Sequence, residues 1–254
     1  MRRVILALAL IVACAPPLQV QGWWVPAPMS SWQWQLQGTV STAVVASVFD
    51  VDGFDVPAAT VATLHGQGKK VICYISAGSW EDWRSDAGAF PESVKGSNNG
   101  WDGEKWLDIR QIAILAPIMT ARMDMCVAKG FDALEPDNID GYANNSGFPL
   151  TAADQLAYNR WLATEAHARG LGIGLKNDLD QVAALVPDFD FLIVEQCYQY
   201  QECGLTAPFR DAGKAIFAAE YRDKVPGKCA NAVTRGMSLI EKRSSLNAWR
   251  QSCL

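Results

Sequence analysis

The sequence predicts an α/β protein built as a single (β/α)8 barrel of the TIM type. One module recurs along the chain: a helical stretch, a glycine, and a short apolar strand that ends in polar residues. Strands that alternate with helices of about 10–15 residues indicate parallel βαβ units. Eight strand candidates in roughly 220 residues fit a barrel better than an open sheet. The chain also lacks the GxGxxG or GxxxxGK[ST] turn that an open doubly wound sheet would favour.

The first half of the chain supplies four of these strand candidates. "WQWQLQ" and "VVASVFDVD" are expected to be strands joined by a loop too short for a helix. In "PAATVATLHGQGKKVICYIS", Pro57 suits a first helical turn and Gly66 or Gly68 a helix end, so a strand is expected over residues 70–76. "KWLDI" is expected to be a further barrel strand.

The later modules carry clearer helix signals. Gly130 should end the helix of "APIMTARMDMCVAKG". Thr151 is a predicted N-cap with Asp154 three residues on, and Gly170 a predicted stop. "VPDFDFLIVEQC" reads as another strand, and a fourth module surrounds Gly213. "MSLIEK" near residue 237 could be one more strand.

The N-terminus has the pattern of a secretory signal. "MRRVILALALIVAC" carries two arginines and then an apolar run too short for a membrane span, which needs about 20 apolar residues. We expect a signal peptide over residues 1–20, with approximate cleavage, and one domain over residues 21–254. The alternative is a bacterial lipobox, "IVAC", which would leave a lipid-anchored Cys14 at the cell surface.

Charge and cysteine content narrow the classes further. Loss of Arg2 and Arg3 leaves 20 basic against 27 acidic groups, a net charge near −7. This charge argues against nucleic acid and favours a neutral or cationic partner. Six cysteines remain after the signal, which suggests disulfides in an exported chain. We expect the pairs Cys197–Cys203 and Cys229–Cys253 and, with weaker grounds, Cys73–Cys126.

Acidic residues gather at the predicted strand ends. In a (β/α)8 barrel, the chemistry lies at the carboxyl ends of the strands, where residues distant in sequence meet. Six of the eight ends carry at least one carboxylate, which predicts a strongly acidic barrel mouth. The residues at these ends are Asp50, Asp52, Ser76, Asp108, Asp137, Lys176, Asp178, Glu195 and Glu220.

Crowded carboxylates suit three kinds of chemistry: glycoside hydrolysis, a bound metal, or recognition of a cationic ligand. A metal is not favoured, because "DVDGFD" at residues 50–55 lacks the glutamate of a calcium loop. His65 and His167 precede glycines at helix ends, far from the mouth, so a Ser-His-Asp triad has no base. We expect no cofactor and no metal site.

Tryptophans concentrate in the first half of the chain. Each alone is more readily explained by packing, but Trp80 and Trp83 follow the strand end at Ser76 and are candidates for stacking on a sugar ring.

Several spaced motifs together resemble glycoside hydrolase family 114, the endo-α-1,4-polygalactosaminidases, and in particular its fungal secreted members. The motifs lie in the family's order between Trp32 and Tyr221, and they are "VICYISAGSWEDWR", "GEKWLDIR", "ALEPDNIDGY", "GIGLKND", "VEQCYQYQEC" and "FAAEY". The resemblance implies cleavage within α-1,4-linked galactosamine polymers, including galactosaminogalactan, by a retaining mechanism. It places the catalytic acids on Asp137 and Glu195.

By analogy with other retaining α-glycosidase barrels, Asp137 is expected to be the nucleophile and Glu195 the acid/base, with the opposite assignment left open. An acidic mouth would attract the ammonium groups of free galactosamine. Glu135 stands where the family pattern suggests aspartate, and strand alternation places it on the same face as Asp137. Lys176 would keep a carboxylate ionised.

The expected substrate-binding set also contains residues with an equally good structural interpretation, as salt bridges or loop caps; Asp140 in particular precedes a glycine in a turn signal. The set is Asp52, Tyr74, Trp80, Asp108, Glu135, Asp140, Tyr142, Lys176, Asp178, Glu220 and Tyr221. The expected partner is a cationic amino-polysaccharide bound by a monomer. The competing hypotheses are a non-catalytic barrel that binds amino-polysaccharide, and a glycosidase acting on a different α-linked glycan.

Overall fold

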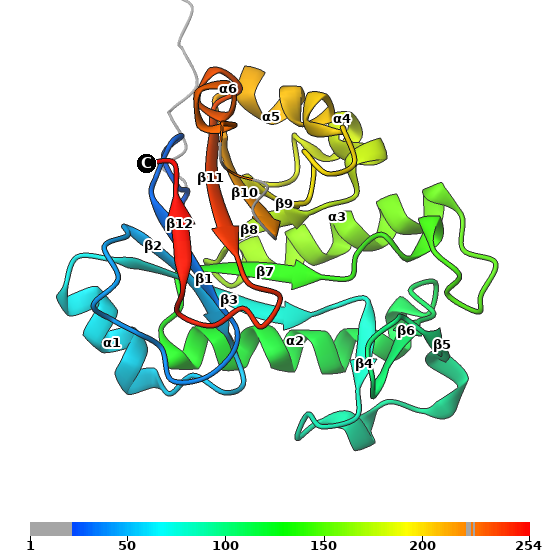
Figure 1. Cartoon of the computed structure of the whole chain (residues 1–254). Coiled ribbons are helices and arrows are strands. Elements are labelled where there is room, and N and C mark those ends of the chain that lie inside the picture. The colour runs from blue at the N-terminus through cyan, green and yellow to red at the C-terminus, as the bar shows by residue number, and fades with distance from the viewer. Residues whose placement is uncertain (1–21, 222–224, 226) are drawn as a thin grey trace, which may run out of the picture.

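The computed structural model describes residues 22–221, 225 and 227–254, and its main element is a barrel of eight parallel strands (Figure 1). The predicted signal peptide and Cys14 lie outside the described residues. The parallel strands, in order round the barrel, are β1 (Trp32–Gln35), β2 (Val48–Asp52), β3 (Lys70–Ser76), β7 (Ala133–Asp137), β8 (Gly172–Lys176), β9 (Phe191–Glu195), β10 (Ala215–Tyr221) and β11 (Met237–Lys242).

The barrel is nearly closed, and a ninth strand completes the seam. Strand β12 (Arg250–Ser252) runs antiparallel to β11. The chain that leads to β12 bonds to β1: Gln33 Nε2 donates to Ala248 O at 2.8 Å, and Leu36 N donates to Leu246 O at 3.0 Å. Across the same seam, Trp32 Nε1 donates to Ser238 O at 2.8 Å. The predicted (β/α)8 fold is therefore confirmed, and "MSLIEK" is its eighth strand.

The helices that cover the barrel are unequal in length. Three of them fit the predicted modules well, whereas the later helices are short. The helices are α1 (Ala58–Gly66), α2 (Ile112–Lys129), α3 (Ala152–Ala168), α4 (Val182–Leu185), α5 (Ala207–Asp211) and α6 (Cys229–Thr234). Thr151 and Asp154 form the expected capping box, and Gly130 ends α2 in the left-handed conformation with φ 87°.

One predicted barrel strand is a strand of a different sheet. "KWLDI" contributes β6 (Glu104–Leu107), which pairs with β4 (Ser79–Glu81) and β5 (Lys95–Asn98) in a separate antiparallel sheet. Figure 1 shows this small sheet beyond the end of β3. A short apolar strand has the same local pattern in a hairpin as in a barrel, and its partner is set by the loops around it.

Two apolar layers hold the fold together. The barrel interior is filled by side chains such as Trp32, Ile72 and Phe217, and the larger layer lies between strands and helices. All three expected disulfides are present: Cys73–Cys126 joins β3 to α2, Cys197–Cys203 closes the loop after β9, and Cys229–Cys253 fixes the C-terminus. Among the described residues, no helix is long and apolar enough to cross a membrane.

Candidate active site

Two adjoining cavities open at the carboxyl end of the barrel and together form one cleft. The first cavity, of about 470 Å³, is lined by Asp52, Glu81, Trp83, Arg84, Glu104 and Tyr221 among others. The second cavity, of about 440 Å³, is lined by Asp140, Tyr142, Asp178, Asp180, Tyr200 and Glu202 among others. Both cavities share five residues, which lie where they meet: Trp101, Asp137, Asn138, Glu195 and Gln196.

A buried lysine links the two central carboxylates. Lys176 Nζ lies 3.0 Å from Asp137 Oδ1 and 3.0 Å from Glu195 Oε1. Because both oxygens contact one nitrogen, they can be no farther apart than the sum of these two distances. Burial would lower the pKa of Lys176, but the carboxylates of Asp137, Glu195 and Glu135 raise it well above its ordinary value. The lysine is therefore a permanent cation between two acids.

Each central carboxylate also accepts a phenol hydrogen bond. Tyr74 donates its hydroxyl to Asp137 Oδ2 at 2.8 Å, and Tyr221 donates to Glu195 Oε2 at 2.5 Å. The backbone N–H of Asn138 donates to Asp137 Oδ1 at 2.8 Å. Burial opposes ionisation of Asp137, but Lys176 and these donors outweigh it and lower the pKa of this carboxyl group below its ordinary value.

The backbone turns sharply just after the strand ends that carry these groups. Asn138, Asn177 and Gln196, which follow Asp137, Lys176 and Glu195, have φ values of 62°, 51° and 56°. Non-glycine residues rarely adopt this region, and such conformations concentrate at functional sites. Asn177 also accepts the backbone N–H of Glu195 on its side-chain oxygen at 3.0 Å.

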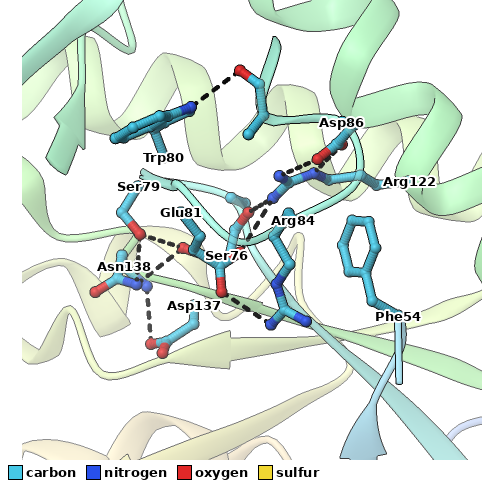
Figure 2. A network of polar contacts seen from close by, with 12 residues as sticks. Phe54, Ser76, Ser79, Trp80, Glu81, Arg84, Asp86, Arg122, Asp137 and Asn138 are labelled. Atoms are coloured by element: carbon cyan, nitrogen blue, oxygen red, sulfur yellow. Dashed lines mark hydrogen bonds and ion pairs between the residues drawn. The ribbon is translucent and has the colours of Figure 1, made fainter. Parts of the chain in front are cut away.

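The loop that follows β3 fixes the conformation of Asn138. The Asn138 amide donates to Ser76 Oγ at 2.9 Å and to Ser79 Oγ at 3.2 Å, as Figure 2 shows. Gly78 allows this approach, because a Cβ there would lie 1.6 Å from the carbonyl oxygen of Asn138. Arg122, from α2, anchors the same loop by donating to Ser76 O at 2.6 Å.

The first cavity contains an arginine that is already neutralised. Arg84 holds Asp52 with two hydrogen bonds, of 3.0 and 2.7 Å, and lies 2.8 Å from Glu81 Oε1. Figure 2 shows Phe54 beside Arg84 and Arg122, and the arginine carbons lie 4.7 and 5.0 Å from the centre of its ring. Asp52 therefore lines the cavity, but its charge is neutralised by the structural ion pair with Arg84.

The second cavity holds carboxyl groups that resist ionisation. Burial and the nearby charge of Asp137 raise the pKa of Asp140 to about 6. Burial and the charge of Asp140 raise the pKa of Asp178 to about 8, although Tyr142 and Asn159 hydrogen-bond to it. Asn159 Nδ2 donates to Asp178 Oδ2 at 3.0 Å. A cationic ligand in this half of the cleft would stabilise the ionised forms of these carboxyl groups.

Four predicted site residues do not line the cleft. Trp80 alternates with Ser79 and Glu81 on β4, so its ring faces away and packs against Lys95, while its indole N–H donates to Ala87 O. Asp108 follows β6 rather than a barrel strand, and its carboxylate pairs with Arg110 at 2.7 Å.

The other two are buried, one on each face of the barrel wall. Glu220 shares the face of Ala218, toward the helices, and accepts the backbone N–H of Tyr198 at 2.8 Å. Glu135 does point inward, but it is fully buried beneath Asp137. The remaining predicted residues do line the cleft: Asp52, Tyr74, Asp137, Asp140, Tyr142, Lys176, Asp178, Glu195 and Tyr221.

The sequence interpretation missed several residues of the site. Glu81 and Glu104 come from the small antiparallel sheet and Arg84 from the loop after β4, and the position of this sheet has no local signal in the sequence. Asn138 and Gln196 could have been found as the residues directly after the two central acids. Trp34 lies two residues from Trp32 on β1, so alternation alone would place it in the barrel.

The two histidines lie far from the cleft, as their positions before glycines at helix ends indicated. His65 pairs with Asp132 and His167 with Asp190, just before the starts of β7 and β9, at the opposite end of the barrel from the cleft. Within the residues that the structure describes, no group of three or more His, Cys, Asp or Glu side chains is arranged to hold a metal ion.

A (β/α)8 barrel with two close carboxylates in the middle of a cleft defines the class of glycoside hydrolases that work with an acid pair. The model of the glycoside-hydrolase family GH114 matches residues 14–254 of the chain. The chain therefore belongs to family GH114, as the motifs indicated.

Solved structures agree with this assignment. Ega3 from Aspergillus fumigatus, in a complex with galactosamine, is 40% identical, with 91% of this chain and 97% of that chain covered and a TM-score of 0.85. The glycoside hydrolase domain of PelA from Pseudomonas aeruginosa is 15% identical, with 87% and 97% covered and a TM-score of 0.67, which supports the fold.

A curated relative is less informative. An uncharacterised protein of Deinococcus radiodurans is 29% identical over 205 residues, which are 71% of this chain. The match spans 65% of the length of that relative.

Proposed function

We propose that the chain is an exported, endo-acting glycoside hydrolase that cleaves α-1,4-linked galactosamine polymers with retention of configuration. Asp137 would act as the nucleophile and Glu195 as the acid/base. The observation that carries this proposal is the meeting of the two carboxylates at Lys176, in the middle of the cleft, where each has an oxygen 3.0 Å from the same nitrogen. Retaining enzymes hold their carboxyl groups about 5 Å apart, whereas inverting enzymes separate them by about 6.5 Å or more. A pair that shares one ammonium group fits the shorter spacing better.

One hydrogen bond distinguishes the two acids and favours this division of roles: both contact Lys176 and a tyrosine hydroxyl, but only Asp137 also accepts the backbone N–H of Asn138. A nucleophile must be ionised, and Asp137 accepts from Lys176, Tyr74 and a backbone N–H, all of which stabilise its anion. Glu195 would protonate the leaving oxygen while Asp137 attacks the anomeric carbon. A covalent glycosyl-enzyme results, and Glu195 then takes a proton from the water that hydrolyses it.

The shape of the cleft supports attack within a polymer. The first and second cavities lie on either side of the central carboxylates, so sugar units can be bound on both sides of the scissile bond. Trp83, Trp101 and Tyr200 line these cavities with 52%, 65% and 58% of their surface exposed, although most large apolar side chains are buried. Exposed aromatic rings of this kind can stack on sugars.

The charge of the cleft supports an amino sugar. The described cations that line it are Arg84 and Lys176, and both already pair with carboxylates. The second cavity is lined by four acidic residues, Asp140, Asp178, Asp180 and Glu202, and an ammonium group bound there would favour the ionised forms of Asp140 and Asp178, whose pKa values burial raises. The complex of Ega3 with galactosamine adds to this support. Three disulfides are compatible with an exported protein.

The test is the release of reducing ends from purified galactosamine polymer by the wild-type protein and by D137N and E195Q. Each variant should lose about 1,000-fold or more in kcat and keep its melting temperature, since each carboxyl group forms or breaks a bond to the sugar. D124N, which alters an acid paired with Arg169 on the surface, is the matched control and should keep full activity. Full activity of either cleft variant would refute the assignment.

Azide separates the two roles. In D137G, azide would enter from the side of the missing nucleophile and give the β-glycosyl azide, whereas in E195A it would displace Asp137 from the glycosyl-enzyme and give the α-glycosyl azide. The reverse pattern would exchange the two roles.

Fully acetylated polymer should be cleaved more slowly than deacetylated polymer, because it lacks the ammonium groups. A wild-type protein that binds the polymer but releases no reducing ends would instead be a binding module.

A further inference from the structure

Below the central carboxylates lies a layer of buried titratable groups. Asp50 and Glu135 are fully buried and line neither cavity, so the substrate cannot reach them, and Lys176 is 1% exposed and forms part of the lining of the second cavity. Strand register sets their positions: Trp34 on β1 is opposite Asp50 on β2, and Tyr74 on β3 is opposite Glu135 on β7. A charge inside a barrel is costly, so these groups need one another.

Glu135 is at the centre of this layer. Its Oε1 lies 3.1 Å from Lys176 Nζ, and its Oε2 accepts the indole N–H of Trp34 at 3.1 Å. Three carboxylates, those of Glu135, Asp137 and Glu195, lie within 3.1 Å of the nitrogen of Lys176, and the contact with Glu135 Oε1 is an ion pair without a hydrogen bond. Glu135 therefore holds the ammonium group from below while the two central acids hold it from above.

Asp50 lies beside Glu135, and neither of its buried carboxyl oxygens has a hydrogen-bond partner in the structure. Two carboxyl groups in contact, away from water, cannot both be ionised, so one of them carries a proton. Burial raises the pKa of Glu135 above its ordinary value as well, but Lys176 and the indole N–H of Trp34 favour its anion, and Asp50 contacts neither group. The proton therefore belongs on Asp50. In agreement, burial and the charge of Glu135 raise the pKa of Asp50 well above its ordinary value.

We propose that Glu135 is a positioning residue for the reaction, which fixes Lys176 between Asp137 and Glu195, and that Asp50 serves as its neutral, protonated hydrogen-bond donor. This inference rests on the proposed function. The negative charge of Glu135 does not take part in the chemistry. It stays constant while the charges above it change.

The value of a constant charge follows from the two chemical steps. Before attack, Asp137 is ionised and Glu195 is protonated, so Lys176 faces the anions of Glu135 and Asp137. In the glycosyl-enzyme, Asp137 is esterified and Glu195 is ionised, so Lys176 faces the anions of Glu135 and Glu195. The lysine keeps two anionic partners at both stages, and it need not move as the charge passes from one central acid to the other.

E135Q removes this charge and keeps the shape. We expect kcat to fall about 100-fold with KM within about threefold, since Lys176 loses its lower anchor and the substrate does not touch Glu135. The titratable groups around Glu135 are Asp50, Tyr74, Asp137 and Lys176, with Glu195 and Tyr221 beyond the lysine. With one anion fewer around Lys176, both limbs of the pH profile of kcat/KM should move about one unit lower.

E135D tests the same point if the glutamine variant does not fold. It keeps the charge but withdraws it by one methylene, so the pH profile should stay in place while kcat falls about tenfold. If E135Q folds and keeps both its kcat and its pH profile, Glu135 is no more than a core residue and the proposal fails. A shift of the pH profile in E135D equal to the shift in E135Q would also contradict the proposal.

Asp50 has its own pair of variants. We expect kcat of D50A to fall about 30-fold. D50N keeps a neutral hydrogen-bond donor at this position and should retain most of the activity that D50A loses. A D50N variant as inactive as D50A would show that the charged form of Asp50 is required.

Infrared spectroscopy tests the proton without an activity assay. At about pH 8 the carbonyl band of protonated carboxylic acids, to which Asp178 contributes in both proteins, should be stronger in the wild-type protein than in D50N, and a band of equal intensity would overturn the assignment of the proton to Asp50. Loss of hydrolysis in D137N with no effect of E135Q would leave the proposed function intact and refute only this inference.

Discussion

The hydroxyl of Tyr221 donates to Glu195 Oε2 at 2.5 Å, so the phenol and Lys176 hold the two oxygens of one carboxyl group. Tyr221 ends β10 and Glu195 ends the adjacent β9, and the register between these strands brings the two side chains to the same edge of the barrel. The carboxyl group is thus fixed in direction before any sugar enters. An acid that must give up a proton and later take one back gains from being held this way.

Removal of this hydroxyl gives the first prediction. Y221F should lower kcat about 10- to 100-fold, the range expected for loss of one hydrogen bond to a charged group. KM should change much less. Tyr198→Phe is the matched control, because its hydroxyl bonds to Asn231 outside the cleft. Steady-state kinetics on galactosamine polymer decide the matter, and equal activity of the two variants would mean that Tyr221 does not orient Glu195.

A glycine supplies the second prediction. A Cβ on Gly78 would lie 1.6 Å from Asn138 O, so G78A must push the loop after β3 away from the residue that follows Asp137. We expect a loss of about 3 kcal/mol in the free energy of unfolding and a fall in activity. G88A lies in the same loop with no atom within 4 Å of its Cβ and should be neutral. Urea denaturation of both variants measures the difference.

The sequence predicts much of this fold because each signal is local. Thr151 with Asp154, and Gly130, mark helix ends through contacts within a few residues, and the structure has both. The central pair Asp137 and Glu195 could be found because barrel topology brings strand ends together.

Contacts between distant segments could not be predicted in this way. Asp108 was misplaced because β6 pairs in a hairpin sheet, and pairing depends on loops rather than on the strand itself. Glu220 was misplaced by one residue, which on a strand moves a side chain to the other face. The part played by Asp50 depends on Glu135, 85 positions later in the chain, so neither residue reveals it alone.

The disulfides give the third prediction. In the chain-entropy model, a cross-link stabilises more when it closes a longer loop. Cys73–Cys126 spans 53 residues and Cys197–Cys203 spans 6. Replacing the first pair with alanines should cost about 4 kcal/mol and the second about 2 kcal/mol. Chemical denaturation of both double variants measures the costs, and the opposite order would show that local packing outweighs loop length.

The exposed aromatic rings give the fourth prediction. W101A should raise KM for polymer about fivefold, because Trp101 lines both cavities and stacking is worth about 1 kcal/mol. W83A and Y200A should instead change the lengths of the products, since each ring lines only one side of the central carboxylates. Trp249 is 37% exposed and lines neither cavity, so W249A is the control. Identical product patterns in all four variants would rule out sugar binding by these rings.

The fifth prediction concerns pH and stability. The pKa of Asp178 rises from an ordinary value of 3.8 to about 8 in the folded protein, through burial and the charge of Asp140. Between these two values the folded state binds a proton that the unfolded state has released, so this residue stabilises the fold at low pH and its contribution is lost as the pH rises toward 8. D178N, which has no proton to lose, should avoid that loss.

The melting temperature of D178N, relative to wild type, should therefore rise between about pH 4 and pH 9, by about 10 °C in all. D102N removes an exposed acid that does not act on Asp178 and serves as the control for a general change in charge. Differential scanning calorimetry across the pH range gives both comparisons. A difference between D178N and wild type that stays constant with pH would show that Asp178 ionises normally, and the second cavity would then hold one more free carboxylate at neutral pH.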